Sequence, residues 1–64
     1  MLVKELVIMD SGNTQYTLYH TVDKSWYGGL GIICNKTEAR VRFGNYTIVN
    51  FEVIAKNKVS VHIR

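Results

Sequence analysis

Alternation between apolar and polar side chains is the feature that most limits what this chain can fold into. The segments 14–22 (TQYTLYHTV), 38–43 (EARVRF) and 59–64 (VSVHIR) change character at nearly every position. A period of two residues is typical of β-strands with one buried face. Residues 2–9 (LVKELVIM) are apolar on both faces, and we expect them to pair with residues 14–22 as a hairpin.

Two further segments complete the predicted sheet. Residues 30–35 form a short apolar strand, and in residues 46–55 (YTIVNFEVIA) the apolar positions change parity midway. This change predicts a bulge near Val49–Asn50. The sequence therefore predicts an all-β fold: a small antiparallel sheet or barrel of about five to six short strands, similar in size to SH3-like and OB-like barrels, with one helical turn near 22–27.

The chain is short for a protein that must bury its own core. Its 64 residues allow a single domain, residues 1–64. A domain this small buries only about 60% of the surface that its unfolded chain exposes, so such folds commonly rely on disulfides, a metal or a partner subunit. Cys34 is the only cysteine, and His20 and His62 lie far apart in the sequence. We therefore expect no disulfide, no metal and no cofactor, and we expect a homo-oligomer.

Nothing in the sequence indicates export or a membrane. Lys4 and Glu5 interrupt the apolar N-terminal run. No apolar stretch approaches the ~20 residues that a membrane-spanning helix needs. A single cysteine in apolar surroundings fits a reducing compartment. These features predict a cytoplasmic protein that does not bind a membrane.

The sequence also lacks the pattern of an active site. Cys34 follows two isoleucines in an apolar strand, so we expect a buried structural cysteine rather than a nucleophile. The carboxylates occur singly, without an acid–base pair. The glycine-rich segment 28–31 lacks both the lysine of a P-loop and the helix that follows a dinucleotide fingerprint. We predict that the protein is not an enzyme.

The stretch SWYGG, residues 25–29, is the candidate binding site. Polar residues precede Trp26 and Tyr27 and glycines follow them, which predicts a solvent-facing loop. At least one of the two rings is then an interaction anchor, and Tyr19 is assigned to the same surface. The alternative is a structural corner in which Trp26 caps the core.

An excess of apolar side chains favours protein binding. Hydrophobic residues make up 47% of the chain, but one small barrel has only one inside. We therefore expect the second face of residues 2–9 to contact a second copy. The main hypothesis is a dimeric accessory or inhibitor protein, a kind of small chain common in phages and other mobile elements, that binds another protein through an apolar–aromatic surface.

The alternative hypothesis is a β-barrel that binds nucleic acid. The net charge is +3, with two basic and three acidic residues in the first half of the chain and six basic and two acidic residues in the second. If residues 38–43 and 59–64 were neighbouring strands, their polar faces and the adjoining turn would form one basic patch. The residues assigned to this patch are Arg40, Arg42, Lys56, Lys58, His62 and Arg64.

Overall fold

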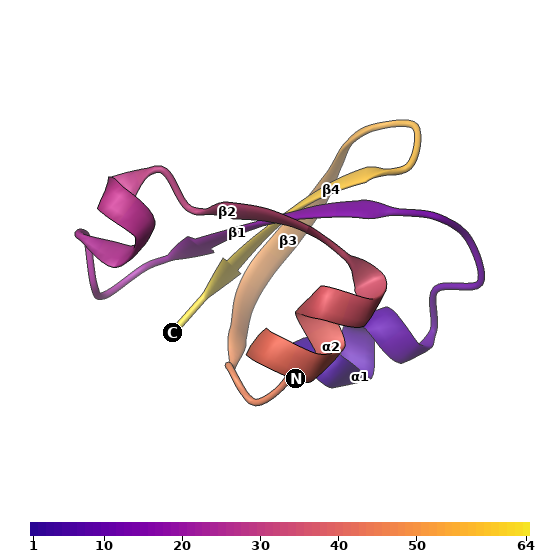
Figure 1. Ribbon diagram of the computed structural model, residues 1–64, viewed down its shortest axis with the longest axis horizontal. Helices are drawn as coiled ribbons and strands as arrows, with labels where there is room; N and C mark the ends of the chain where they lie inside the picture. Colours follow the sequence, from indigo (N-terminus) through magenta and orange to yellow (C-terminus); the bar gives the residue numbers. More distant parts are fainter.

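The computed structural model describes all 64 residues and contains a four-stranded mixed sheet with two helices on one face (Figure 1). The elements in chain order are α1 (Val3–Ile8), β1 (Gln15–His20), the 3₁₀ turn η1 (Trp26–Gly29), β2 (Ile32–Asn35), α2 (Lys36–Phe43), β3 (Ile48–Ala55) and β4 (Lys58–Ile63). The strand order is β2-β1-β4-β3. β1 and β4 run parallel, and the two outer pairs are antiparallel.

The prediction of an all-β sheet or barrel is wrong, because two of the expected strands are helices and the sheet is open. Residues 2–9 contain α1, so they form no hairpin with residues 14–22. Val3 and Val7 are four residues apart, and both are buried. A run that is apolar on both faces fits a helix as well as a strand, and periodicity alone cannot separate the two. The expected contact of this segment with a second copy is wrong too, since these valines lie in the core.

Residues 38–43 are also helical. Within α2, Ala39 and Phe43 are buried one helical turn apart, whereas Val41 is exposed. An alternating strand would have put all three on the same face. A capping box begins the helix: the Glu38 N–H donates to the Asn35 side chain over 2.8 Å, and the Asn35 N–H donates to the Glu38 carboxylate over 3.4 Å.

The remaining segments form strands close to the predicted limits. The register between β3 and β4 shifts between Ile48 and Asn50, which confirms the bulge near Val49–Asn50. The turn η1 overlaps the helical turn expected near 22–27. Neither helix has the length and apolar content that crossing a membrane requires.

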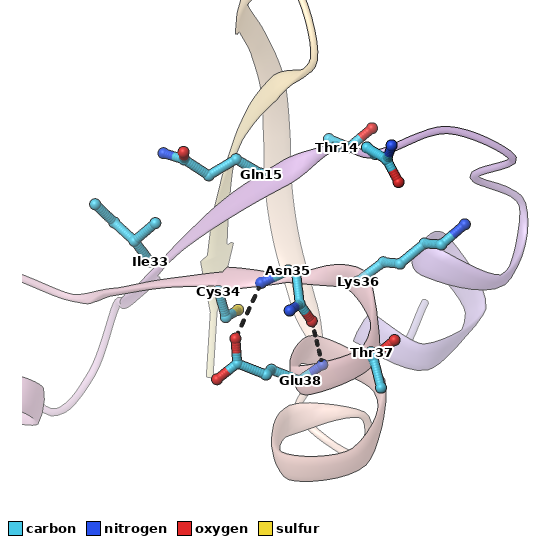
Figure 2. A pocket seen from close by; sticks show the side chains of 9 residues that line it. Thr14, Gln15, Ile33, Cys34, Asn35, Lys36, Thr37 and Glu38 are labelled. Carbon is cyan, nitrogen blue, oxygen red and sulfur yellow. Dashed lines mark hydrogen bonds between the residues drawn. The ribbon is translucent and has the colours of Figure 1, made fainter.

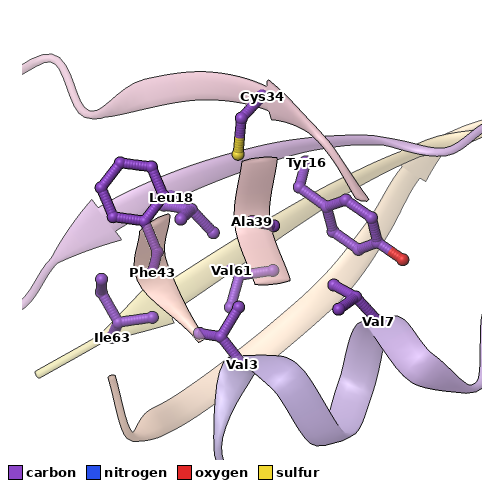
Figure 3. Packing of buried hydrophobic residues seen from close by; sticks show 9 residues of the cluster. All are labelled: Val3, Val7, Tyr16, Leu18, Cys34, Ala39, Phe43, Val61 and Ile63. Atoms are coloured by element: carbon purple, nitrogen blue, oxygen red, sulfur yellow. The ribbon is translucent and has the colours of Figure 1, made fainter. Parts of the chain in front are cut away.

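The core lies between the helices and the inner strands (Figure 3). Each helix, together with β1, β2 and β4, contributes to it, and its nine buried hydrophobic residues are Val3, Val7, Tyr16, Leu18, Cys34, Ala39, Phe43, Val61 and Ile63. At its margin the Tyr16 hydroxyl donates to the Asp10 carboxylate over 2.9 Å. β3 supplies no fully buried residue, because it lies at the edge of the sheet beyond the helices.

Candidate protein-binding site

The candidate loop, residues 21–31, projects from the end of β1 at one side of the molecule (Figure 1). Local hydrogen bonds fix its first half. The Asp23 N–H donates to His20 Nδ1 over 2.8 Å, and the Asp23 carboxylate accepts from the Ser25 N–H and hydroxyl over 3.1 and 2.7 Å. The bonds from Ser25 lower the pKa of Asp23 below its usual range. The loop therefore has a defined conformation without a bound partner.

The second half of the loop adopts left-handed backbone conformations. Tyr27 has φ 48°, which is uncommon for a residue other than glycine. Gly31 has φ 73°, and a Cβ at this position would overlap the Leu18 carbonyl oxygen. The loop thus packs closely against β1 where it returns to the sheet, and this approach requires a glycine.

Trp26 covers the edge of the core. Its side chain is half-buried, and its ring centroid lies 5.6 Å from that of Phe43, 5.7 Å from that of Tyr46 and 5.7 Å from that of His20. Edge-on and tilted aromatic contacts of this kind stabilise a fold. The structure therefore gives Trp26 the capping position that the sequence left as the alternative.

Tyr27 is the exposed member of the pair. Its side chain is 45% exposed, and its ring stands edge-on to Trp26 at 4.7 Å. The Arg42 guanidinium donates to the Tyr27 hydroxyl over 3.0 Å and lies 4.9 Å from the centre of the Phe43 ring. α2 therefore holds Tyr27 in place through Arg42. The sequence analysis missed this contact because it placed Arg42 on a strand.

Tyr19 lies on the opposite face of the sheet from α2, which holds Tyr27. It packs against His62 with ring centroids 5.4 Å apart, on the sheet face away from the helices. Tyr19 and Trp26 both line an open hollow of about 450 Å³, and Tyr27 does not. The structure therefore brings Tyr19 together with Trp26 and places Tyr27 outside the hollow.

Two apolar residues that the sequence analysis did not single out extend the loop surface. Val22 and Leu30 lie at the two ends of the loop, and Leu30 is 81% exposed. The sequence did carry a signal for them: each lies beside turn-forming residues, Val22 before Asp23 and Leu30 between two glycines. Apolar side chains in such a loop have no place in the core and are therefore expected at the surface. We call Val22, Tyr27 and Leu30 the loop surface.

The basic residues do not form the single patch that was expected. Arg40 and Arg42 lie on α2, on the helical side of the sheet. Lys56 and Lys58 lie at the β3–β4 hairpin, and Arg64 follows the opposite end of β4. His62 packs against Tyr19 on the other face. The expected arrangement is wrong because it depended on residues 38–43 being a strand.

Cys34 is buried among core residues, and burial raises the pKa of its thiol to about 11. The thiol therefore stays protonated at neutral pH. The hollow beside it, about 470 Å³, lies where β1 and β2 meet the start of α2 (Figure 2). The capping box already occupies the Asn35 and Glu38 groups that face this hollow.

In comparisons with protein-family models, with curated proteins and with solved structures, nothing matches this chain.

Proposed function

We propose that this chain is a small, non-enzymatic protein-binding module, an accessory or inhibitor protein that binds another protein through the loop surface. One observation carries the proposal. Three apolar side chains are exposed on a loop whose backbone is held by hydrogen bonds at one end and by close packing at the other. Tyr19 and Trp26 line a hollow beside the same loop, and none of the three loop-surface residues lines it.

The physical argument rests on exposure and on preorganisation. Several apolar side chains exposed to water on one ordered loop favour a binding site, and an exposed tyrosine is a favoured anchor in interfaces. A loop already ordered in the free protein loses less conformational entropy on binding. Tyr27 in a left-handed backbone conformation fits such a loop, because local strain gathers at binding sites.

Nucleic-acid binding has less support. A protein that binds a phosphate backbone gathers its lysine and arginine side chains on one face or along one groove. Here those residues are divided among α2, the β3–β4 hairpin and the C-terminal end of β4. No aromatic platform lies beside the two lysines of the hairpin, since the aromatic cluster surrounds Trp26.

Capture of partners from a cell lysate, with and without nuclease, tests the proposal. We expect the wild-type chain to retain a protein partner after nuclease treatment, with little loss as salt is raised. Tyr27→Ala and Leu30→Ala should each weaken binding while the fold is kept, and truncating an anchor costs about 2 kcal/mol or more. Ile8→Ala, at an exposed apolar position on α1, is the matched control and should bind as wild type does.

Two results would contradict the proposal. One is a partner that nuclease releases, with affinity falling steeply as salt rises, which indicates nucleic acid. The other is equal binding by wild type, Tyr27→Ala and Leu30→Ala. Trp26→Ala is not used to judge binding, because this ring also covers the core.

A further inference from the structure

His20, the last residue of β1, supports the candidate loop with its side chain. Its ring nitrogen Nδ1 accepts two backbone hydrogen bonds, from the Asp23 N–H over 2.8 Å and from the Val22 N–H over 3.2 Å. No other group of the chain accepts from these two N–H groups. Val22 belongs to the loop surface, so one imidazole ring ties the beginning of that surface to the sheet.

Aromatic neighbours hold the His20 ring in this orientation. Its centroid lies 5.7 Å from that of Trp26 and 5.8 Å from that of Tyr46, which stands edge-on to it. These contacts connect the hydrogen bonds at the start of the loop with the ring that covers the edge of the core. A displacement of the His20 ring therefore affects both the backbone at Val22 and the surroundings of Trp26.

The two hydrogen bonds require a neutral imidazole. A ring nitrogen accepts a hydrogen bond only while it carries no proton, so the His20 ring carries its single proton on Nε2. A second proton turns Nδ1 into a donor that faces two other donors, and the Val22 and Asp23 N–H groups lose their acceptor. Turning the ring over does not restore the bonds, because a carbon atom then takes the place of Nδ1.

The surroundings of His20 contain groups of both charges. The titratable and charged residues around the ring come from the loop, from the end of the sheet and from the segment before β3, and they are Tyr19, Asp23, Lys24, Tyr46, His62 and Arg64. Asp23 is the one acid among them, and its charge attracts a protonated imidazole. This attraction lowers the pKa of Asp23 less than the two hydrogen bonds from Ser25 do.

The Asp23 carboxylate does not replace the lost acceptor. It accepts from the N–H and the hydroxyl of Ser25, and from neither of the N–H groups that His20 binds. The attraction keeps a protonated ring near the loop without supplying an acceptor for the backbone. The second half of the loop is unaffected, because Gly31 still packs against the Leu18 carbonyl.

We propose that His20 is a pH-dependent switch whose protonation releases the beginning of the loop and weakens binding through the loop surface. This inference rests on the proposed function, since it names how the same surface is regulated. Histidine is the side chain that changes charge between pH 5 and pH 8. At neutral pH the imidazole accepts both bonds and holds Val22 in place. In mildly acidic solution both bonds are lost, and binding then carries the entropy cost of ordering the loop again.

Nuclear magnetic resonance of the free protein between pH 8 and pH 5 tests the release. At the alkaline end the His20 ring should show an unprotonated Nδ1 and a protonated Nε2. As the ring gains its second proton, the amide protons of Val22 and Asp23 should move upfield, because each loses its acceptor. The emission of Trp26, the only tryptophan, should change with the same midpoint. Amide protons of Val22 and Asp23 that stay in place while the ring titrates would overturn the proposal.

An asparagine at position 20 separates the acceptor from the proton. Its side-chain oxygen can take the place of Nδ1 but does not titrate. His20→Asn should therefore show no movement of the Val22 and Asp23 amide protons over the same pH interval. His62→Asn, at the other histidine of the chain, is the matched control and should titrate as wild type does. Loss of the response in His62→Asn, with the response kept in His20→Asn, would contradict the assignment to His20.

Partner capture at neutral pH and at about pH 5 tests the regulation. Wild type should bind about fivefold or more weakly at the lower pH, the change that the loss of one backbone hydrogen bond produces. His20→Asn should bind equally well at both. Equal loss of binding by wild type and His20→Asn would overturn the regulation. The resonance experiment needs no partner, so failure of the switch and failure of the proposed function are observed separately.

Discussion

At the scale of single residues, the candidate loop can return to the sheet only because Gly31 has no side chain. Gly31 has a left-handed backbone conformation and sits directly against the Leu18 carbonyl. We expect Gly31→Ala to destabilise the fold by about 2 kcal/mol or more, since strain and steric overlap add. Urea denaturation measures the change. Gly12→Ala is the control, because a Cβ there would meet only the Asp10 carboxylate, at 3.5 Å. Equal stabilities of the two variants would contradict the close approach at Gly31.

A second residue-scale prediction concerns alkaline pH. Burial, and then the hydrogen bond to Asp10, raise the pKa of Tyr16 from 10.0 to about 12. Because the pKa is higher in the folded state, the stability contributed by this phenol is complete below pH 10 and is lost as the pH rises toward 12.

The unfolding free energy of wild type and Tyr16→Phe, measured by urea denaturation across this pH interval, checks the sign. The wild type should lose stability more steeply than Tyr16→Phe. Tyr19→Phe removes an exposed phenol and should keep the wild-type slope. Identical slopes for wild type and Tyr16→Phe would contradict the assignment.

At the scale of elements, α1 and α2 show why apolar spacing was ambiguous. In residues 2–9 almost every position is apolar, so helix and strand patterns are both satisfied. In residues 38–43, Ala39 and Phe43 fit a period of two and also one helical turn. One sequence signal could have distinguished helix from strand in this segment. Asn35 followed three residues later by Glu38 is the pattern of a capping box, which marks the first turn of a helix.

Substitutions on α1 distinguish the helix from the strand that was expected. Val7 is 3% exposed in the core, whereas its neighbour Ile8 is 76% exposed. Val7→Lys buries a charge, and we expect a loss of about 3 kcal/mol or more, enough to unfold a marginal domain. Ile8→Lys should change stability by about 0.5 kcal/mol or less. Thermal unfolding followed by circular dichroism compares them, and a larger loss for Ile8→Lys would contradict the orientation of α1.

At the scale of the whole molecule, the domain is too small to bury its apolar residues. Only 11 of 64 residues are buried, and 13 large hydrophobic side chains remain exposed. Seven of the 13 lie in two segments, three on the loop that follows β1 and four on the edge strand β3 (Figure 1). So much exposed apolar surface on a small domain favours binding to another protein, as the proposed function requires.

The sequence by itself determined the features that depend on neighbouring residues. Alternation located β1 and β4, and the change of parity in β3 located its bulge, because both follow from the geometry of a single strand. Polar residues and glycines placed residues 25–29 at the surface for the same local reason.

The tertiary structure decided whatever depends on residues far apart in the chain. Val3 and Val7 form a helix because the sheet offers one face to cover, and β1 pairs in parallel with β4 across more than half of the sequence. Trp26 is covered by Phe43 and Tyr46, which no local pattern connects to it. Long-range packing selects among local structures of nearly equal free energy, and for this reason the helices and the open β3 edge emerge only in the folded chain.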